Sequence, residues 1–489
     1  MILFDTPNIA FAVVPCLFFA WTLFTTIYSW QRLRHASWSY LWIAKFCWKG
    51  KQYEDYLDLA NKYGPLVRVG PNELVCDSPD VARHIARTKT NRSDWYLGFR
   101  FNPYHSSMFN ILEAGPHDKR KAQLTPGYSG KDANKSGGIE AVVDYQLSNL
   151  VEQIRTKYAR PRGGFCPMDL AAIIPLFTLD VISHLVLGTE FGLHGFYRSL
   201  QNHLPSMSLS TEIPFFRKIF YSSIGLKLFG PKETDKEGLG RLMKLVNAKV
   251  WERYNEPNAK TEGDILGSFV RNGLTQTECE VETLFLFIAG SETTANALKA
   301  TMLYLLTNPV AYLRLRDECH TAVREGRVSN PIKFAEAKTL PYLQAVTYEG
   351  LRIRPVTTFR LPKDIPSEGD TLNGYFVPGG TSVGVNISSL LRSRTVFGDD
   401  ANVFRPERFI EADEATRTEM QRNVELNFGY GRWMCSGKPI AWMELHKTCF
   451  ELIRHFDFQL VDPTGIAPSL TFGNFLDRNW FVRVTESIS

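Results

Sequence analysis

Hydrophobic side chains recur with helical spacing along most of the chain, which predicts a protein built mainly of helices. From about residue 139 to 325 the pattern is mostly helical, with breaks at 160–167 and 229–240, where glycine and proline gather. The longest predicted helix runs from about Gln276 to Thr307. Because its positions between Leu284 and Ile288 are apolar on every side, we expect this helix to be buried.

Two more helices are predicted in the C-terminal half of the chain. One spans residues 339–355, since Pro341 fits its first turn and Pro355 would stop it. The other follows the last cysteine-containing loop, where apolar residues recur with helical spacing at 445, 449, 452, 453 and 456.

Alternating apolar residues predict short strands toward both ends of the chain. A short helix (53–64) precedes LVRVG and ELVCDS, which predict a strand pair over 66–78 with a turn at Pro71-Asn72. Residues 371–387 predict strand, turn and strand.

The C-terminal WFVRVTE (480–486) alternates like a last strand. No proline-rich or Gly/Ser-rich linker, charge block or repeat divides the chain. We therefore expect a mainly α (α+β) fold class, one large helix-rich domain with small β-sheets.

An uncharged apolar run, Ile9–Ser29, predicts a membrane anchor. Its 21 residues are enough to cross a bilayer at about 1.5 Å per residue. Asp5 precedes the run and Arg32 and Arg34 follow it, so the positive-inside rule places the remainder in the cytosol. A cleaved signal peptide is the alternative, but no basic segment precedes the run and no A-x-A site follows it. The expected organisation is a short lumenal N-terminus (1–8), a transmembrane anchor (9–29), a membrane-proximal linker (30–50) and a cytosolic domain (51–489).

The composition mainly excludes certain classes of function and site. The 489 residues are 44% hydrophobic and 22% charged, which is ordinary globular composition. The net charge of +5 is too small to indicate nucleic-acid binding, and no basic run is interleaved with stacking aromatics. The eight cysteines show no C-x-x-C spacing, so neither a zinc site nor a secreted disulfide framework is expected.

One cysteine, Cys435, stands behind a glycine-rich turn and ahead of a predicted helix, in NFGYGRWMCSGKPIAW (427–442). Gly429, Gly431 and Gly437 let the backbone turn tightly and approach a bulky ligand. Backbone N–H groups of the turn and the positive end of the helix would favour a thiolate. An anionic axial sulfur is what a haem iron needs to promote O–O cleavage. A buried structural cysteine is the alternative.

The segment AGSETT (289–294), inside the long helix, carries a second candidate constellation. Gly290 weakens the helix, and the Thr293 hydroxyl can bond back to a carbonyl one turn earlier and bend it. The bend would open a groove for dioxygen and a water, beside which Glu292 offers a carboxylate for relaying protons. A polar helix face is the alternative, but the flanking sequences are apolar.

These motifs resemble those of the cytochrome P-450 superfamily. FGYGRWMCSG (428–437) is similar to that family's haem-binding loop. AGSETT, the pair Glu349-x-x-Arg352 and PERF (406–409) precede it in the order in which the family carries them. The resemblance extends from the predicted anchor to the C-terminus.

The resemblance implies haem b (iron protoporphyrin IX) as the cofactor, with Cys435 as the axial iron ligand. It implies that Thr293 assists oxygen activation and that Glu292 belongs to the proton route. The residues that it places around the haem are Phe428, Gly429, Gly431, Gly437, Ala289 and Gly290.

Glu349 and Arg352 share one helix face, and from spacing alone they form an ion pair of the kind that is worth little when exposed. The resemblance implies that the pair is buried and joined by Arg408 of PERF. The three would then support the cysteine loop structurally.

The haem propionates require cations. GPHDKRKAQLTPGYS (115–129) resembles the family helix in which an aromatic residue precedes an arginine by four positions. His117 and Lys121 occupy those positions, although a solvated charge run is an equal alternative. A second cation is expected from Arg360 or Lys363, between which the sequence does not decide.

Two departures from the family pattern stand out. Trp433 occupies the position, two residues before Cys435, where an arginine usually contacts a propionate, and the sequence assigns it no role beyond packing. No proline lies between Pro15 and Pro65, where a proline-rich hinge usually follows the anchor.

The implied activity is that of a monooxygenase held in the endoplasmic reticulum membrane, with its catalytic domain in the cytosol. Electrons are expected from an NADPH-dependent flavoprotein reductase, since the chain carries no flavin or nicotinamide motif. Arg432, Lys438 and Lys447 surround the cysteine loop and are candidates to receive an acidic partner. Solvated side chains are the alternative for each.

VRVGPNEL, RSDWY and GYSGK resemble filamentous-fungal members of specialised metabolism, which implies a lipophilic substrate such as a terpenoid or polyketide intermediate. Two other classes remain open: a haem-thiolate enzyme that rearranges or dehydrates without O2, and a non-catalytic, membrane-tethered haem protein. The intact Glu292-Thr293 pair counts against the first. The segments expected to line an apolar substrate pocket are 95–110, 205–220, 284–288, 356–359 and 470–474.

Overall fold

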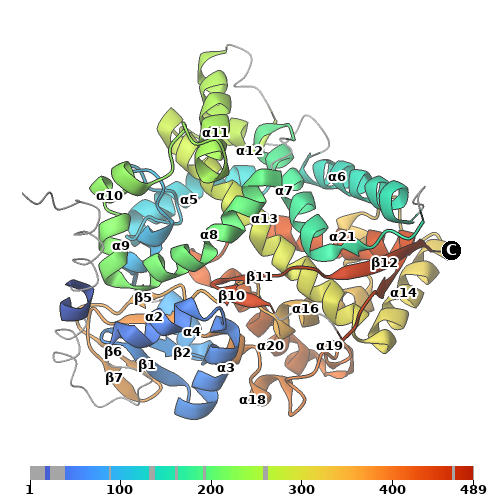
Figure 1. Ribbon diagram of the computed structural model, residues 1–489. Helices are drawn as coiled ribbons and strands as arrows, with labels where there is room; N and C mark the ends of the chain where they lie inside the picture. Colours follow the sequence, from blue (N-terminus) through green and yellow to red (C-terminus); the bar gives the residue numbers. More distant parts are fainter. Residues whose placement is uncertain are drawn as a thin grey trace, which may run out of the picture.

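The computed structural model describes residues 17–21, 39–87, 90–130, 138–159, 164–190, 194–256, 263–464 and 469–487, and helices dominate them (Figure 1). The helices of the N-terminal half are α2 (Tyr40–Trp48), α3 (Gln52–Tyr63), α4 (Pro79–Arg87), α5 (Ala114–Tyr128), α6 (Gly138–Ile154), α7 (Leu170–Leu187), α8 (His194–Glu212), α9 (Pro214–Phe220), α10 (Ser223–Phe229) and α11 (Gly238–Asn255). The later helices are α12 (Ile265–Arg271), α13 (Gln276–Leu306), α14 (Pro309–Arg324), α15 (Phe334–Ala337), α16 (Pro341–Ile353), α17 (Ile387–Leu390), α18 (Arg394–Phe397), α19 (Arg408–Glu411), α20 (Glu414–Val424) and α21 (Lys438–His455). Short 3₁₀ turns are η1 (Asp94–Phe99), η4 (Glu425–Phe428) and η5 (Gly431–Trp433), and η2 (Arg155–Ala159) is a π-helical turn.

Short strands form small sheets, as predicted. In the described part of the chain, the largest has the order β1-β2-β8-β5-β3 and consists of β1 (Leu66–Gly70), β2 (Glu73–Cys76), β8 (Ser382–Val385), β5 (Lys363–Asp364) and β3 (Asn91–Arg92). The others are β4-β12-β9, from Met168–Asp169, Phe481–Glu486 and Phe456–Leu460, and the pairs β6-β7, from Asp370–Leu372 and Tyr375–Val377, and β10-β11, from Leu470–Phe472 and Asn474–Leu476.

The predicted strands are present, with one correction. β1 and β2 form the expected antiparallel pair, and β12 is the expected last strand. The segment 371–387, predicted as strand, turn and strand, instead contributes to three strands. A tight hairpin, β6-β7, turns at Asn373-Gly374, and β8 leaves it to pair in parallel with β2.

The long predicted helix is α13, which runs unbroken through the molecule. Its N-terminus carries a capping box, in which the Thr275 hydroxyl accepts from the N–H of Glu278 and the Glu278 carboxylate accepts from the N–H of Thr275. α7 packs closely alongside, since a Cβ on Gly290 would lie 2.9 Å from the Ile182 side chain. Gly290 therefore has a packing reason as well as the predicted conformational one.

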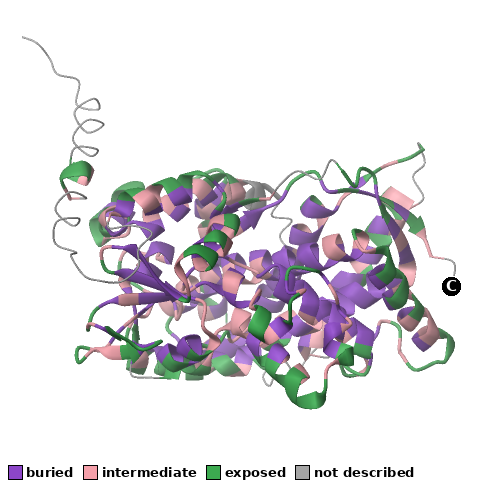
Figure 2. Cartoon of the chain, turned by 90° about the horizontal axis from the view of Figure 1, so that it is seen from below, coloured by how far each residue is buried: buried purple, intermediate pink, exposed green. Residues whose placement is uncertain are grey.

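The core lies where α7, α13, α16 and α21 meet, and buried residues fill this interior in Figure 2. Burial of α13 on nearly every side confirms the expectation drawn from its apolar sequence. The glycine-rich cysteine loop directly precedes α21.

The predicted anchor, 9–29, lies mostly outside the described residues. Residues 17–21 are helical, and within them Phe18 stacks at 5.0 Å on Phe216 of α9, while Trp21 stacks at 4.7 Å on Tyr40 of α2. Among the described residues, α7 is the helix long and apolar enough to cross a bilayer. Because 72% of its apolar window is buried inside the protein, α7 is a core helix.

Candidate active site

The cysteine loop has the tight backbone that its glycines predict. Gly429 and Gly431 adopt φ values of 74° and 59°, a left-handed conformation that strains other residues. A Cβ on Gly429 would also lie 3.0 Å from the carbonyl oxygen of Trp433. The N–H of Cys435 donates to the carbonyl of Phe428 at 2.7 Å, which closes the loop directly ahead of α21.

The surroundings of the Cys435 sulfur act on its ionisation in both directions. The protein packed around the sulfur raises the pKa of the thiol by desolvation, although the residue retains exposed surface, whereas hydrogen bonds from the N–H groups of Gly437 and Lys438, together with the nearby charges of Lys121 and Lys438, act to lower it. The net direction is upward, so the loop alone does not secure the thiolate that we expected. A coordinated metal ion deprotonates a thiol outright, and these N–H groups would then stabilise the anion.

Cys435 also differs from the other cysteines in access. Of the seven cysteines that the structure describes, Cys435 is exposed, Cys166 is half-buried and the rest are buried. An accessible sulfur that accepts backbone hydrogen bonds at the start of a helix is suited to bind a ligand, whereas a structural cysteine would be packed away.

One face of α13 is accessible in its otherwise buried middle. Phe285, Ala289 and Thr293 are half-buried and recur every fourth residue, whereas most residues between them are buried. The Thr293 hydroxyl donates to the carbonyl of Ala289 at 2.8 Å, so the predicted bond to the preceding turn is confirmed. Glu292 beside it is buried, with 2% of its surface exposed.

A hydrogen bond from α7 fixes the same stretch of α13. The Thr178 hydroxyl donates to the carbonyl of Ser291 at 2.8 Å, and the Ser291 hydroxyl donates to the carbonyl of Phe287 at 2.6 Å. Both bonds lie within or beside the AGSETT segment. The backbone of this segment is therefore anchored to α7 by a bond that the sequence did not indicate.

The buried ion-pair network has the members that the family resemblance implies. Arg352 donates twice to Glu349, with both N···O distances 2.7 Å, and Arg408 Nε donates to the same carboxylate at 3.1 and 3.2 Å. All three side chains are at most 3% exposed. Arg352 Nη1 also donates to the carbonyls of Leu391 and Ala401.

The helix that carries this network touches the cysteine loop. Asn427 Nδ2 donates to the carbonyl of Leu351 at 3.2 Å, and the Tyr348 hydroxyl donates to Glu425 at 3.3 Å. The network therefore fixes α16 as a platform against which the loop packs, which is the structural role expected of it.

His117, predicted near the propionates, lies against the loop. It is buried, and its ring is centred 4.4 Å from that of Trp433. Burial and the charges of Arg92 and Lys121 lower the pKa of His117 to about 4, while the hydrogen bond to Asp118 acts in the opposite direction. The imidazole is therefore neutral at pH 7, able to donate a hydrogen bond but without a charge.

Two of the predicted propionate cations bind other groups. Lys121 Nζ donates to the carbonyls of Arg432 and Met434 at 2.8 and 2.7 Å, so it holds the loop backbone. Arg360 forms a buried ion pair with Glu212 of α8, with Nε 2.9 Å from the carboxylate. Arg360 thus lies in a different network from the cysteine loop, contrary to its assignment as a haem ligand.

Lys363, the other candidate left open by the sequence, does lie at the loop. Its Nζ is 5.4 Å from the ring centre of Trp433 and donates to the Tyr96 hydroxyl at 2.6 Å. Arg92, which sequence reasoning missed, lies 4.7 Å from the same ring. Pairing of β3 with β5 makes Arg92 and Lys363 direct cross-strand partners.

Of the three cations thought to surround the cysteine loop, Lys447 was placed wrongly. It is fully buried in α21 and forms ion pairs, both 2.7 Å, with Glu140 and Asp144 of α6. A buried lysine satisfied within the chain offers no surface to a partner. Arg432 is exposed and Lys438 half-buried, and each lies near a carboxylate, Asp118 at 3.7 Å and Glu425 at 2.9 Å respectively.

The five predicted pocket segments meet in the interior. One buried cluster combines Trp95, Tyr96, Phe99 and Phe359, and the partly buried Phe109, Met207 and Phe285 pack against it. Met207 also contacts a neighbouring cluster that contains Phe472. Phe285 belongs to the accessible face of α13, and its ring stacks on Phe109 at 4.8 Å. The aromatic cluster therefore adjoins the AGSETT segment.

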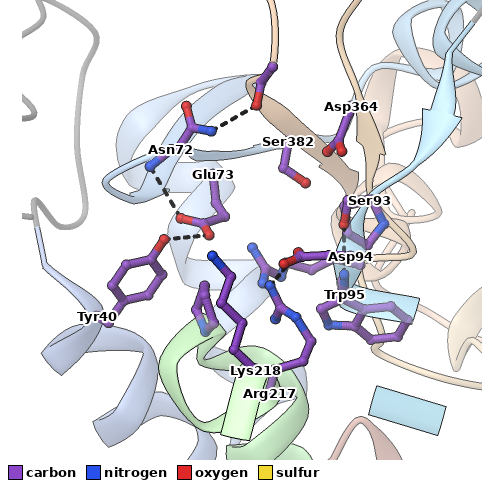
Figure 3. A pocket seen from close by; sticks show the side chains of 14 residues that line it. Tyr40, Asn72, Glu73, Ser93, Asp94, Trp95, Arg217, Lys218, Asp364 and Ser382 are labelled. Carbon is purple, nitrogen blue, oxygen red and sulfur yellow. Dashed lines mark hydrogen bonds and ion pairs between the residues drawn. The ribbon is translucent and has the colours of Figure 1, made fainter. Parts of the chain in front are cut away.

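A polar cavity of about 270 Å³ adjoins the aromatic cluster (Figure 3). Arg217 Nη2 pairs with Asp94 at 2.6 Å, and Arg360 lines the same cavity while paired with Glu212. Trp95 belongs to both the cavity lining and the cluster, and its indole N–H donates to Glu212 at 3.0 Å. The charged lining makes this cavity a poor seat for an apolar ligand, which the aromatic cluster suits better.

Comparison with known proteins agrees with this geometry. The family model described as Cytochrome P-450 matches residues 34–478. The chain is 47% identical, over 92% of its length and 90% of the relative's, to the cytochrome P-450 monooxygenase aba1 of Botryotinia fuckeliana. It is 40% identical to abl1 of Leptosphaeria maculans, over 93% and 83% of the two lengths, and 30% identical to pisatin demethylase of Fusarium vanettenii, over 86% and 83%. The chain therefore belongs to the cytochrome P-450 monooxygenase family.

Proposed function

We propose that this P-450 inserts one oxygen atom of O2 into a lipophilic substrate by hydroxylation or epoxidation. The observation that carries the proposal is the accessible Cys435 sulfur, which accepts hydrogen bonds from the N–H groups of Gly437 and Lys438. Haem b, the cofactor that the family implies, would supply the activation of dioxygen. The chain supplies position, protons and control of water.

The residues available to hold the haem fit a flat, bulky group. Cys435 would bind the iron on one side, within a loop whose Gly429, Gly431 and Gly437 bring backbone close to the ligand, and Phe428 closes that loop. On the other side, Ala289 and Gly290 present little side chain on the accessible part of α13. Small residues here leave room for a planar ligand and for oxygen.

Thr293 and Glu292 are the residues proposed to manage protons. The Thr293 hydroxyl donates to the Ala289 carbonyl, so its oxygen is oriented to accept a hydrogen bond from the direction of the accessible helix face. Thr293 would hold a water or a protonated oxygen at that place. The buried Glu292, which directly precedes Thr293 in the sequence, would receive protons from solvent and pass them on.

The substrate class follows from the aromatic cluster. Trp95, Phe99, Phe285 and Phe359 form an apolar wall that favours a lipophilic molecule over a charged one. The chain is similar to fungal cytochrome P-450 monooxygenases. The proposed substrate is a terpenoid or polyketide intermediate of specialised metabolism, the class that the sequence resemblance implies.

Electron supply and location complete the proposal. The reductant would be NADPH, used through a separate flavoprotein reductase. Arg432 and Lys438 beside the cysteine loop would attract an acidic docking surface. The apolar run 9–29 would anchor the protein in the endoplasmic reticulum membrane, with residues 51–489 in the cytosol.

The test uses the full-length protein in microsomes together with a P-450 reductase. Terpenoid and polyketide intermediates are supplied with NADPH under ¹⁸O2, and products are analysed by mass spectrometry. A monooxygenase incorporates one ¹⁸O atom per hydroxyl or epoxide formed and consumes NADPH. A product that forms without label and without NADPH would instead establish rearrangement or dehydration, and would overturn this proposal.

A further inference from the structure

Trp433 holds a hydrogen-bond donor that the protein does not use. The side chain is 8% exposed, and its indole Nε1 is buried without a hydrogen-bond partner among the described residues. The ring is held in place from several directions. His117 packs against it at 4.4 Å, and Lys121 binds the carbonyls of Arg432 and Met434 on either side. A buried N–H without an acceptor costs free energy, and a ligand that accepts from it would recover that cost.

Two buried cations face the same ring. The guanidinium of Arg92 lies 4.7 Å from the Trp433 ring centre, and the ammonium of Lys363 lies 5.4 Å from it. The β3-β5 register places these two residues directly opposite each other, where like charges destabilise a sheet.

Nothing in the described part of the chain forms an ion pair with either cation, and Arg92 Nε is also buried without a partner there. Arg92 Nη1 donates to carbonyls and Lys363 to a tyrosine hydroxyl, which satisfies hydrogen bonds but gives neither cation a paired carboxylate. Glu282 acts on Arg92 and Asp364 acts on Lys363 without forming an ion pair. Burial lowers the pKa of both groups, and Arg92 lowers that of Lys363 further. Such a cluster is built for an anion that comes from outside the chain.

A tryptophan suits this place better than a further cation would. An arginine at position 433 would be packed against Arg92 and Lys363 and would add to their repulsion. The indole instead offers a π face that attracts both cations, and it still supplies one N–H donor. Arg92 and Lys363 thus supply positive charge, and Trp433 supplies a hydrogen-bond donor.

We propose that Trp433, Arg92 and Lys363 together bind a propionate carboxylate of the haem. The indole N–H donates to this carboxylate in place of the arginine that the family usually carries at this position, while Arg92 and Lys363 neutralise its charge. This inference rests on haem binding at Cys435 as proposed above.

The variant that isolates the indole N–H is Trp433→Phe, which keeps an aromatic face for the two cations. Haem loss is measured on the purified holoprotein as the rate of transfer to an excess of a haem-scavenging apoprotein, and resonance Raman spectra report the propionate bending modes. We expect transfer to be on the order of tenfold faster, the factor that one hydrogen bond to a charged group contributes, and a shift of one propionate mode. An unchanged rate together with unchanged propionate modes would overturn the inference.

A matched control separates this effect from general loss of packing. Trp480, beside β12, is also buried, and its indole N–H is likewise without a partner among the described residues. Trp480→Phe should leave the transfer rate and the propionate modes as in the wild type. Equal acceleration by both substitutions would show an effect of packing and would contradict the inference.

A haem without charged propionates tests whether the effect of Trp433→Phe depends on the carboxylate. With the dimethyl ester of haem, whose propionates carry no charge, the ratio of transfer rates between Trp433→Phe and the wild type should fall toward one. A ratio as large as with haem itself would overturn the inference. The reduced, carbonyl-bound spectrum of the same wild-type sample reports thiolate ligation separately, so failure of haem binding at Cys435 is distinguished from failure at Trp433.

Discussion

Lys121 of α5 holds the cysteine loop by two backbone carbonyls. Its Nζ donates to Arg432 and Met434 at 2.8 and 2.7 Å, immediately before Cys435. Sequence reasoning assigned Lys121 to a propionate, whereas the structure shows it fixing the approach of the chain to the sulfur. These bonds carry charge on the donor and are therefore among the stronger hydrogen bonds.

Replacing Lys121 with methionine keeps the side-chain stem and removes both bonds. We expect a loss of unfolding free energy of about 2 kcal/mol. We also expect a larger fraction of holoprotein in which the reduced, carbonyl-bound spectrum lacks thiolate character. Lys119→Met, an exposed lysine on the same helix, is the control and should change neither quantity. Similar losses in both variants would show that Lys121 does not act through the loop.

The Glu349 network predicts a steep dependence of stability on one carboxylate. Glu349→Gln leaves Arg352 buried without a counter-charge and leaves Arg408 with Asp400 as its remaining carboxylate, and we expect a cost of about 3–5 kcal/mol in unfolding free energy, measured by denaturant titration. The exposed pair Glu325–Arg327 gives the control, since Glu325→Gln should cost at most about 1 kcal/mol. Comparable costs at the two sites would refute the assigned role of the network.

Substitution of Thr293 should change the coupling of NADPH consumption to product formation and have little effect on haem binding. Thr293→Ala should keep the thiolate spectrum and divert roughly tenfold more of the reducing equivalents to hydrogen peroxide, less than the ~10²–10⁴-fold that a positioned proton-transfer group contributes to a rate. The ratio of product to NADPH consumed measures this. Thr301, which donates to the Ala297 carbonyl at the same 2.8 Å on the same helix, is the control. Unchanged coupling in Thr293→Ala would remove Thr293 from the proposed proton route.

The buried Glu282 of α13 should make the stability of the protein depend on pH. Burial raises its pKa to about 7, even though Arg120 and the N–H of Met108 act to lower it. The ionised form is therefore disfavoured in the folded state, and stability falls as pH rises from about 4.5 to about 7. The total loss should be on the order of 3 kcal/mol.

Glu282→Gln should remove this loss, so the difference in unfolding free energy between variant and wild type should grow across this pH range. Glu278 shares Arg120, but backbone and side-chain hydrogen bonds from Thr275 lower its pKa. Glu278→Gln should therefore not reproduce the effect. If the difference in unfolding free energy between Glu282→Gln and the wild type stays constant from pH 5 to pH 8, the assignment to Glu282 is contradicted.

Much of the fold could be predicted because its signals are local. The α13 helix was predicted to within one residue, since its apolar run is contiguous in sequence. The strands β1, β2 and β12 were likewise visible in alternation. The β6-β7 hairpin was merged with β8, because the pairing of β8 with β2 joins segments about three hundred residues apart and leaves no local trace.

In the candidate site, too, residues in local motifs could be proposed from the sequence, whereas residues brought together by long-range contacts could not. Cys435 and Thr293 could be proposed from the sequence, because each lies in a short motif whose chemistry is carried by adjacent residues. Arg92 was missed, since only the β3-β5 register brings it to Trp433. The sequence could not decide between Arg360 and Lys363, because Glu212, the partner of Arg360, lies on a helix about 150 residues earlier.

The central claim is that Cys435 is the axial thiolate of a haem iron. The most direct measurement is the absorption spectrum of the dithionite-reduced, carbonyl-bound protein, for the wild type, Cys435→Ala and Cys449→Ala. Cys449 is a buried cysteine of α21 and provides the control. We predict a strongly red-shifted Soret band in the wild type and in Cys449→Ala, and its complete loss in Cys435→Ala. A wild type without this band, or a Cys435→Ala variant that retains it, would contradict the account.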